Sequence, residues 1–226
     1  MQRHFDRDIQ ELTEMLLRLG AMVEEAMANS IRALMERDTD LAETVIANDD
    51  AIDRLELEID QATLELIATM QPTAVDLRFV ATLMKITPDL ERIGDLAQDV
   101  AERVVELNRE PPLKRLTDLP QLARAAQEMV HESLDAFVNR DANLAREVIE
   151  RDDEVDALTE SSFRGLLTYM MENPANIARA IRLAFVGKYF ERMADSATNI
   201  CEMVVYLVEA QVIKHRNVAT DGQTGE

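Results

Sequence analysis

Three carboxylates stand four residues apart in the segment DLERIGDLAQD, residues 89–99. They are Glu91, Asp95 and Asp99. Residues four apart share one face of a helix, and like charges at this spacing cost a helix about 0.2–0.5 kcal/mol per pair. Clustered carboxylates repel one another unless protons or cations neutralise them. The spacing therefore makes this segment a candidate cation site.

The same spacing of acids recurs later in the chain. The segment FERMADSATNI repeats the first two acids, and an asparagine stands where the third would be. Two further aspartate pairs at a spacing of four precede these motifs, so two sets of five residues could meet if the helices that carry them are neighbours. The candidate metal ligands are Glu91, Asp95, Asp99, Asp49 and Asp53 in the first set, and Glu191, Asp195, Asn199, Asp152 and Asp156 in the second.

The donor atoms of these sets decide which metal they would suit. All are oxygens, with no cysteine or histidine nearby, and oxygen ligands favour hard cations such as Mg²⁺, Ca²⁺, Mn²⁺ or oxidised iron. Zinc prefers nitrogen and sulfur ligands and is the less suitable ion. The alternative interpretation is an ordinary solvated acidic face that holds no metal.

Catalytic motifs are missing from the rest of the sequence. Glu128 and His131 form the E-x-x-H half of a carboxylate di-iron site, but neither of the other histidines has a glutamate three residues before it. The sequence contains no glycine-rich phosphate loop and no G-x-S-x-G motif. The lone Cys201 lies among apolar residues and is expected to be a buried hydrophobe. We therefore predict a protein that is not an enzyme, with no catalytic residues and no organic cofactor.

The charge and hydropathy of the chain limit its partners. Its 226 residues contain 44 Asp and Glu against 24 Lys and Arg, a net charge of −20. Such a surface repels nucleic acid and anionic lipid. No apolar run reaches the roughly 18 residues that span a bilayer, and charged residues near the start argue against a signal peptide. We predict a cytoplasmic protein that neither binds nucleic acid nor inserts into a membrane.

The chain contains two copies of one pattern. DLAETVIANDDAID at 40–53 returns as NLAREVIERDDEVD at 143–156, and LERIGDLAQDVAERVVEL at 90–107 returns as FERMADSATNICEMVVYL at 190–207. Strong helix formers dominate, and the first copy divides into three helical patterns. These run over about 5–37, 41–70 and 74–107, and we expect the second copy to divide in the same way.

Apolar residues in the third helix of each copy follow a strict spacing of three and four. This is the seam of a bundle helix, and the acidic motif lies nearly opposite it. Long helices with short connections fold back antiparallel. We predict an all-α fold of two tandem three-helix bundles, six long helices in all, related by an approximate twofold axis. The expected divisions are 1–110 for the first bundle, 111–119 for a proline-containing linker, 120–216 for the second bundle and 217–226 for a disordered tail.

With these motifs identified, the chain resembles the PhoU family over about residues 5–215. The resemblance rests on HFDRDIQELTEMLLRLGAMVEEAM at 4–27, QPTAVDLRFV at 71–80, LERIGD at 90–95 and FERMADSATNI at 190–200. It implies two three-helix bundles that form dimers or larger oligomers. It also implies surface clusters of iron or zinc held by the E-x-x-x-D carboxylates. Many relatives have a histidine where this chain has Ser196, which weakens the case for zinc.

The resemblance also implies a function. Members of the family repress the phosphate-starvation response when phosphate is plentiful, linking the ATPase subunit of the high-affinity phosphate ABC transporter to a phosphate-sensing histidine kinase. We therefore expect a regulatory adaptor that acts in phosphate homeostasis and signal transduction, most simply as a homodimer. The alternative is a metal-storage or metal-sensing protein that uses the acidic clusters.

Overall fold

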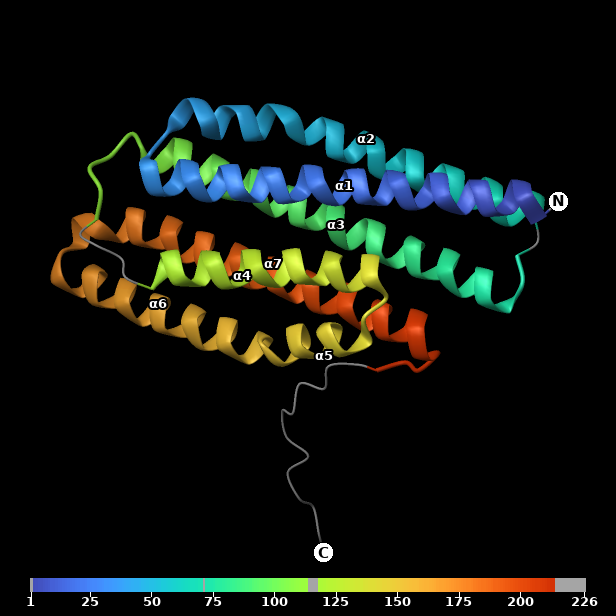
Figure 1. Cartoon of the computed structure of the whole chain (residues 1–226). Helices are drawn as coiled ribbons and strands as arrows, with labels where there is room; N and C mark the ends of the chain where they lie inside the picture. Colours follow the sequence, from blue (N-terminus) through green and yellow to red (C-terminus); the bar gives the residue numbers. More distant parts are fainter. Residues whose placement is uncertain (1, 71, 114–117, 214–226) are drawn as a thin grey trace, which may run out of the picture.

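The computed structural model describes residues 2–70, 72–113 and 118–213, with side chains from residue 7 onward (Figure 1). The predicted tail at 217–226 lies outside the described residues. The residues described contain helices and no strand, which confirms the all-α fold class. The helices are α1 (Gln2–Glu36), α2 (Thr39–Met70), α3 (Ala74–Leu107), α4 (Leu119–Asn139), α5 (Ala142–Glu150), α6 (Asp152–Glu172), the 3₁₀ helix η1 (Pro174–Asn176) and α7 (Ile177–Glu209).

Helices α1, α2 and α3 form the first bundle, and tight connections make them antiparallel neighbours. Arg37 ends α1 in the left-handed conformation with φ 58°, which turns the chain back within three residues. The carboxylate of Asp38 then accepts a hydrogen bond of 3.0 Å from the backbone N–H of Leu41, at the start of α2. Helix α3 continues through Pro88 without a break.

The second bundle repeats this arrangement with one difference. Its middle helix, expected to be continuous like α2, is divided into α5 and α6 at Arg151. There the backbone hydrogen bonds shorten to an i to i−3 pattern, with the N–H of Arg151 bonded to the carbonyl of Val148. The guanidinium of Arg151 also bonds Glu132 at 2.5 Å and Glu128 at 3.2 Å, both on α4. The prediction of six long helices is confirmed, with the middle helix of the second bundle interrupted at this one residue. The side-chain contacts of Arg151 with α4 coincide with the local tightening of the backbone.

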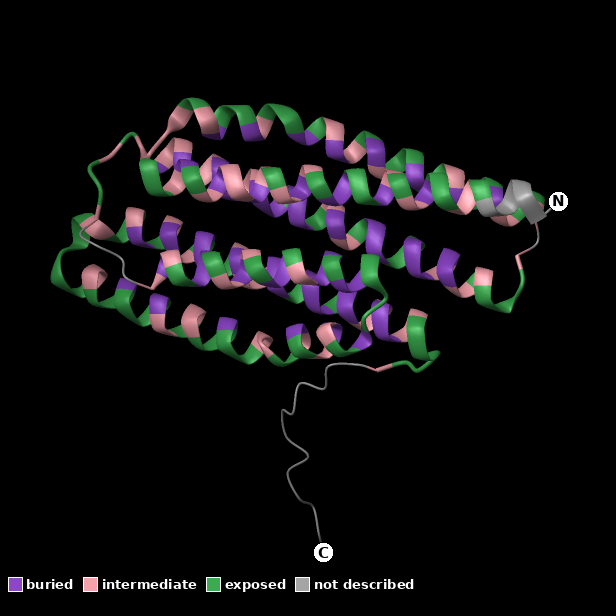
Figure 2. Cartoon of the chain, in the orientation of Figure 1, coloured by how far each residue is buried: buried purple, intermediate pink, exposed green. Residues whose placement is uncertain are grey.

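The predicted seams lie in the core. All eight apolar seam positions of α3, from Leu83 to Leu107, are buried, and so are seven of the eight in α7, from Leu183 to Val204. Figure 2 shows the buried positions concentrated on the inner faces of the helices. Cys201 is fully buried, as expected, and this burial raises the pKa of its thiol to about 12. The spacing of apolar residues thus oriented each third helix correctly.

Helices α3 and α7 pack against each other and join the two bundles. Arg78 donates to the carbonyl of Leu207, and the guanidinium of Arg182 bonds Glu106 at 2.9 Å, so the helices run antiparallel. Asn199 lies between these contacts and donates to Asp89 at 3.2 Å. In the pair with the two copies exchanged, Tyr189 and Asp99, burial and then the Asp99 carboxylate raise the pKa of the Tyr189 hydroxyl. The contact between Asp89 and Asn199 thus has an equivalent between Tyr189 and Asp99, 100 residues away in each helix. An approximate twofold axis between α3 and α7 produces such equivalent contacts.

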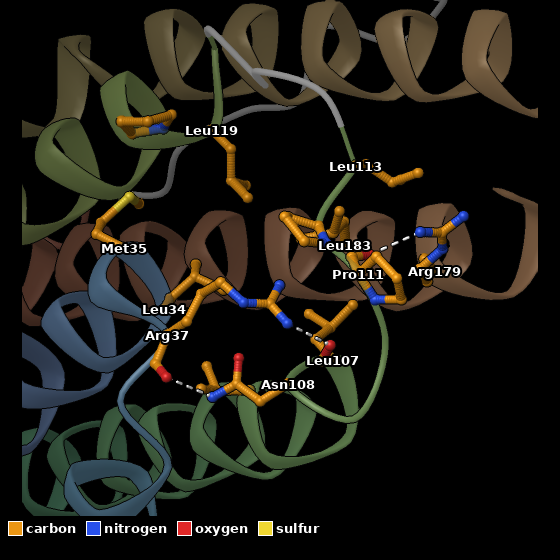
Figure 3. A pocket seen from close by; sticks show the side chains of 13 residues that line it. Leu34, Met35, Arg37, Leu107, Asn108, Pro111, Leu113, Leu119, Arg179 and Leu183 are labelled. Carbon is orange, nitrogen blue, oxygen red and sulfur yellow. Dashed lines mark hydrogen bonds between the residues drawn. The ribbon is translucent and has the colours of Figure 1, made fainter.

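The start of the linker is held by arginines at the junction of the bundles (Figure 3). Arg37 donates to the carbonyls of Leu107 at 3.0 Å and Glu110 at 2.7 Å, and Arg179 donates to the carbonyl of Pro111 at 2.6 Å. Arg37, Arg179, Leu107 and Pro111 contribute to the lining of a mainly apolar cavity of about 220 Å³. Both guanidinium groups therefore serve to bind backbone carbonyls where α3 ends.

Candidate metal centre

A glycine lets α2 and α3 approach closely where the acidic residues lie. A β-carbon added to Gly94 would meet two side-chain carbons of Ile52 at 3.1 Å and the carboxylate of Asp49 at 3.7 Å. A β-carbon there would require the side chain of Ile52 to shift by a few tenths of an ångström. The helices are thus in close contact at Gly94, one residue before Asp95.

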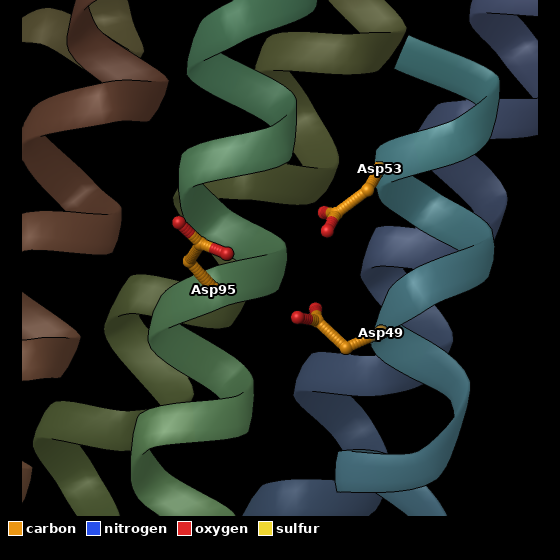
Figure 4. Close-up of side chains that lie close together, drawn as sticks. All are labelled: Asp49, Asp53 and Asp95. Atoms are coloured by element: carbon orange, nitrogen blue, oxygen red, sulfur yellow. The ribbon is translucent and has the colours of Figure 1, made fainter. Parts of the chain in front are cut away.

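Three of the predicted ligands converge across this contact. Asp49 and Asp53 of α2 and Asp95 of α3 each offer a carboxylate oxygen, and these atoms all lie within 4.8 Å of one another (Figure 4). Among the residues that the structure describes, they form the one such group of three. We call this group the acidic trio. It runs from Asp49, which is only 7% exposed, to Asp95 at the surface.

The pKa values of the carboxyls around the trio are raised. Burial, followed by repulsion from Asp53 and Asp95, raises the pKa of Asp49 from 3.8 to about 6. Partial burial, followed by Asp95 and Asp53, raises the pKa of Glu91 from 4.5 to about 7. The negative charges thus gather at one place, and no basic side chain contributes to either pKa shift.

The residues of the trio fit a hard cation. One carboxylate oxygen of Asp53 is buried without any hydrogen-bond partner, although buried polar atoms normally have one. The donors are all carboxylate oxygens, which Mg²⁺, Mn²⁺ and oxidised iron prefer. A bound cation would coordinate this oxygen and remove the repulsion that raises the neighbouring pKa values.

The remaining two predicted ligands of the first set lie beside the trio. Glu91 is half-buried one turn away on α3, and the Asp53 and Asp49 carboxylates raise its pKa. Asp99 lies toward the second bundle, and its pKa is raised by burial and by Glu102, against the opposing effect of Arg103 and Arg192. Glu91 could complete the trio, whereas Asp99 belongs partly to the contact between the bundles.

The second set is arranged differently. Glu191 binds the ammonium of Lys188, one turn earlier on α7, and Asp152 accepts from the hydroxyl of Thr198 at 3.5 Å. Desolvation, Glu191 and Asp156 raise the pKa of Asp195, while Lys188 lowers it. The site thus contains a cation of its own.

Lys188 stands where the first copy has Pro88. The spacing of the acids alone gave no reason to expect a lysine at this site. Asn199 differs from Asp99 for a structural reason as well. Its amide donates to Asp89 across the contact between the bundles, where a carboxylate would repel. Asn199, predicted as a metal ligand, thus takes part in the contact between the bundles.

The E-x-x-H half-motif has a structural role. His131 on α4 contacts the carboxylate of Glu24 on α1 at 2.6 Å, and this contact raises the pKa of the imidazole. Glu128 accepts from Arg151. His131 is a surface residue that joins the two bundles, as expected from the missing second half of a di-iron site.

The fold and the site together define a class: an all-helical protein built from a duplicated three-helix bundle that carries a carboxylate cluster between the second and third helices of one copy. Comparison with known proteins agrees. The PhoU domain model matches the chain twice, at residues 16–104 and 119–204. None of the described helices is long and apolar enough to cross a membrane.

Relatives match over nearly the whole chain. A "phosphate-specific transport system accessory protein PhoU homolog" from Aquifex aeolicus is 40% identical over 96% of this chain and 98% of its own length. The Escherichia coli protein named "phosphate-specific transport system accessory protein PhoU" is 35% identical over 93% of this chain and 88% of its own. The crystal structure of PhoU from Pseudomonas aeruginosa superimposes with a TM-score of 0.89 at 37% identity, over 92% of this chain and all of that one. The chain belongs to the PhoU family.

Proposed function

We propose that the protein is an accessory protein of a phosphate transport system and that it acts as a regulator in phosphate homeostasis. The observation that carries the proposal is the match to accessory proteins of that name over more than nine-tenths of the chain and both of its copies. The acidic surface supports it, since a net charge of −20 favours basic protein surfaces as partners over nucleic acid.

In its finer form, the proposal is a cytoplasmic adaptor that represses the phosphate-starvation response when phosphate is plentiful. It would do so by coupling the ATPase subunit of the phosphate ABC transporter to a phosphate-sensing histidine kinase, without catalysing a reaction itself. A homodimer is the simplest assembly for this role, and sedimentation of the purified protein tests it.

Deletion of the gene tests the adaptor role. In high phosphate we expect alkaline phosphatase activity to rise at least tenfold in the deletion strain and to return to its low level when the wild-type gene is restored. The control is the same deletion grown in low phosphate, where the activity is already high. Activity that stays low in high phosphate after deletion would contradict the proposal.

The acidic trio favours a second candidate function, the binding of a hard cation for sensing or storage. Magnesium, manganese and iron suit its oxygen donors better than zinc does. We expect Asp53→Asn and Asp95→Asn to abolish the increase in melting temperature that a saturating cation produces in the wild-type protein. The matched control is Asp195→Asn in the second copy, which should retain most of the increase. Metal-dependent stabilisation that survives in both trio variants would remove these carboxylates as ligands.

A further inference from the structure

Two rows of exposed apolar side chains run along neighbouring helices of the second bundle. Each row has three large residues spaced four apart, so each lies along one face of its helix. Met171 is 87% exposed, and every other member is at least 40% exposed. The rows are Phe163, Leu167 and Met171 on α6, and Ile177, Ile181 and Phe185 on α7.

These rows flank an open groove between α6 and α7. Its volume is about 630 Å³, and Phe163, Ile181 and Phe185 contribute to its lining. The ring of Phe185 stacks on that of Tyr189 at a centroid distance of 6.4 Å, which extends the apolar surface along α7. Single exposed apolar residues are normal on a protein surface, but a continuous strip of them marks an interaction site.

The first bundle has only part of this strip, so the two copies can be compared position by position. On the offsets of 103 and 100 residues that relate the copies, Phe163 corresponds to Asp60 and Phe185 to Lys85. Met171 corresponds to Ala68, and Ile181 to Ala81. The other two positions of the strip have exposed leucines in the first bundle as well, Leu64 and Leu77. The common scaffold therefore does not need large apolar residues at the first four positions, and packing within a bundle does not account for them there.

The charges around the groove indicate what binds in it. Three carboxylates line it, those of Asp156, Glu160 and Glu191. Lys188 pairs with Glu191 and Arg164 of α6 pairs with Glu160, which leaves a net negative charge at the groove. A second copy of this chain is a poor occupant, because a twofold contact centred on the groove would bring two negatively charged surfaces together. The net charge of −20 on each copy would add to that repulsion.

We propose that this groove binds an amphipathic helix of another protein, one whose apolar stripe is flanked by lysine or arginine. A helix laid between α6 and α7 would place large side chains at i, i+3, i+4 and i+7 against the two rows. Its basic flanks would face the three carboxylates, which speeds association and selects against acidic helices. The inference rests on the proposed adaptor role, since an adaptor requires a docking surface, and it locates that surface on the second bundle alone.

The test is a binding titration by fluorescence anisotropy with a synthetic amphipathic peptide of about five helical turns, roughly 18 residues, carrying leucine and phenylalanine on one face and lysine on its flanks. We expect saturable binding that weakens at high salt. A scrambled peptide of the same composition, or one with glutamate in place of lysine, should bind at least tenfold more weakly. Equal binding of all three peptides would overturn the proposal.

The variants take their residues from the first copy. We expect the double variant F163D/F185K to lose at least tenfold in affinity for the lysine peptide, and Ile181→Ala, a smaller change, to lose a few-fold. The matched control is Leu57→Asp, which alters an exposed apolar residue of α2 and should bind within twofold of the wild-type protein. Circular dichroism confirms folding, since the substituted side chains are exposed. Binding unchanged in both groove variants would overturn the proposal, as would self-association of the wild-type protein that F163D/F185K abolishes.

The same variants separate this inference from the proposed function. In a deletion strain, the wild-type gene and Leu57→Asp should restore low alkaline phosphatase in high phosphate, whereas F163D/F185K should not. If the wild-type gene fails to restore it, the proposed function is wrong and the peptide titration still decides the surface. If F163D/F185K restores it fully, the adaptor role stands and the groove is not its docking surface.

Discussion

The Asp49 carboxyl is a group whose ionisation opposes folding. It is buried beside two other carboxylates of the acidic trio, and its pKa rises from 3.8 to about 6 in the folded protein. An acid with a raised folded pKa contributes stability that is fully present below its unfolded pKa and is lost as the pH rises through the folded pKa. The metal-free protein should therefore lose stability from this group between about pH 4 and pH 6.

Removing that charge tests the effect. Without metal, Asp49→Asn should raise the free energy of unfolding at pH 7.5 by about 1–3 kcal/mol, because two pKa units correspond to at most about 3 kcal/mol. The gain should shrink toward zero near pH 4, where the wild-type carboxyl is protonated. Denaturant titrations of chelator-treated protein at both pH values provide the measurement. Glu58→Gln, an exposed acid on the same helix, is the matched control and should change little; a gain independent of pH would contradict the assignment.

The sequence predicted correctly which way the acids face, but it did not predict which of them come together. The seam spacing placed Glu91 and Asp95 away from the core of their own bundle, and both lie at or near the surface. Which acids converge depends on the axial position of α2 against α3, which in the structure places Ile52 and Asp49 of α2 beside Gly94 of α3. Periodicity within one helix contains no information about such a contact between helices.

At the scale of the elements, the duplication predicted a second bundle like the first. That prediction is correct for α7, whose seam repeats that of α3, whereas α5 and α6 are separated by one residue where α2 is continuous. At this interruption the side chain of Arg151 contacts two glutamates of α4, which lie 19 and 23 residues away in sequence. Local helix propensity cannot anticipate a partner that only the tertiary fold supplies.

One contact between α3 and α7 involves Asn199, the residue that stands in place of the third acid in the second copy. Asn199 donates to Asp89, whose pKa is raised by burial and lowered by this hydrogen bond. Asn199→Asp would replace the donor with a second carboxylate, and we expect it to lower the free energy of unfolding at pH 7.5 by about 1–2 kcal/mol. Urea denaturation measures the loss.

The exchanged pair provides the control for that substitution. D89N/N199D restores one amide and one carboxylate across the same contact, so its stability should return to within about 0.5 kcal/mol of the wild-type value. The loss in Asn199→Asp alone should also diminish at pH 4, where protonation removes the repulsion. A double variant no better than the single one would show that the two side chains do not interact.

For the whole molecule, the position of α3 and α7 makes the two copies one structural unit. Each of these helices is covered by its own bundle on one side and by the other third helix opposite (Figure 1). Contacts extend along the pair, from Arg78 with Leu207 to Glu106 with Arg182. The bundles also meet where the side chain of Leu134 on α4 packs against Gly20 on α1. Because this contact is long and apolar inside, we expect the two copies to stay associated even without the covalent connection between them.

Expressing the two copies as separate chains tests this expectation. Residues 1–113 and 118–226, produced together, should purify as a one-to-one complex that unfolds in a single transition, since each half buries apolar surface of α3 or α7 against the other. Its melting temperature should rise with concentration, because association then stabilises both halves. Produced alone, either half exposes that face and should bind a hydrophobic dye or aggregate. Sedimentation and calorimetry provide the readouts. Two halves that stay monomeric and melt independently would show that the linker, and not the contact between α3 and α7, holds the bundles together.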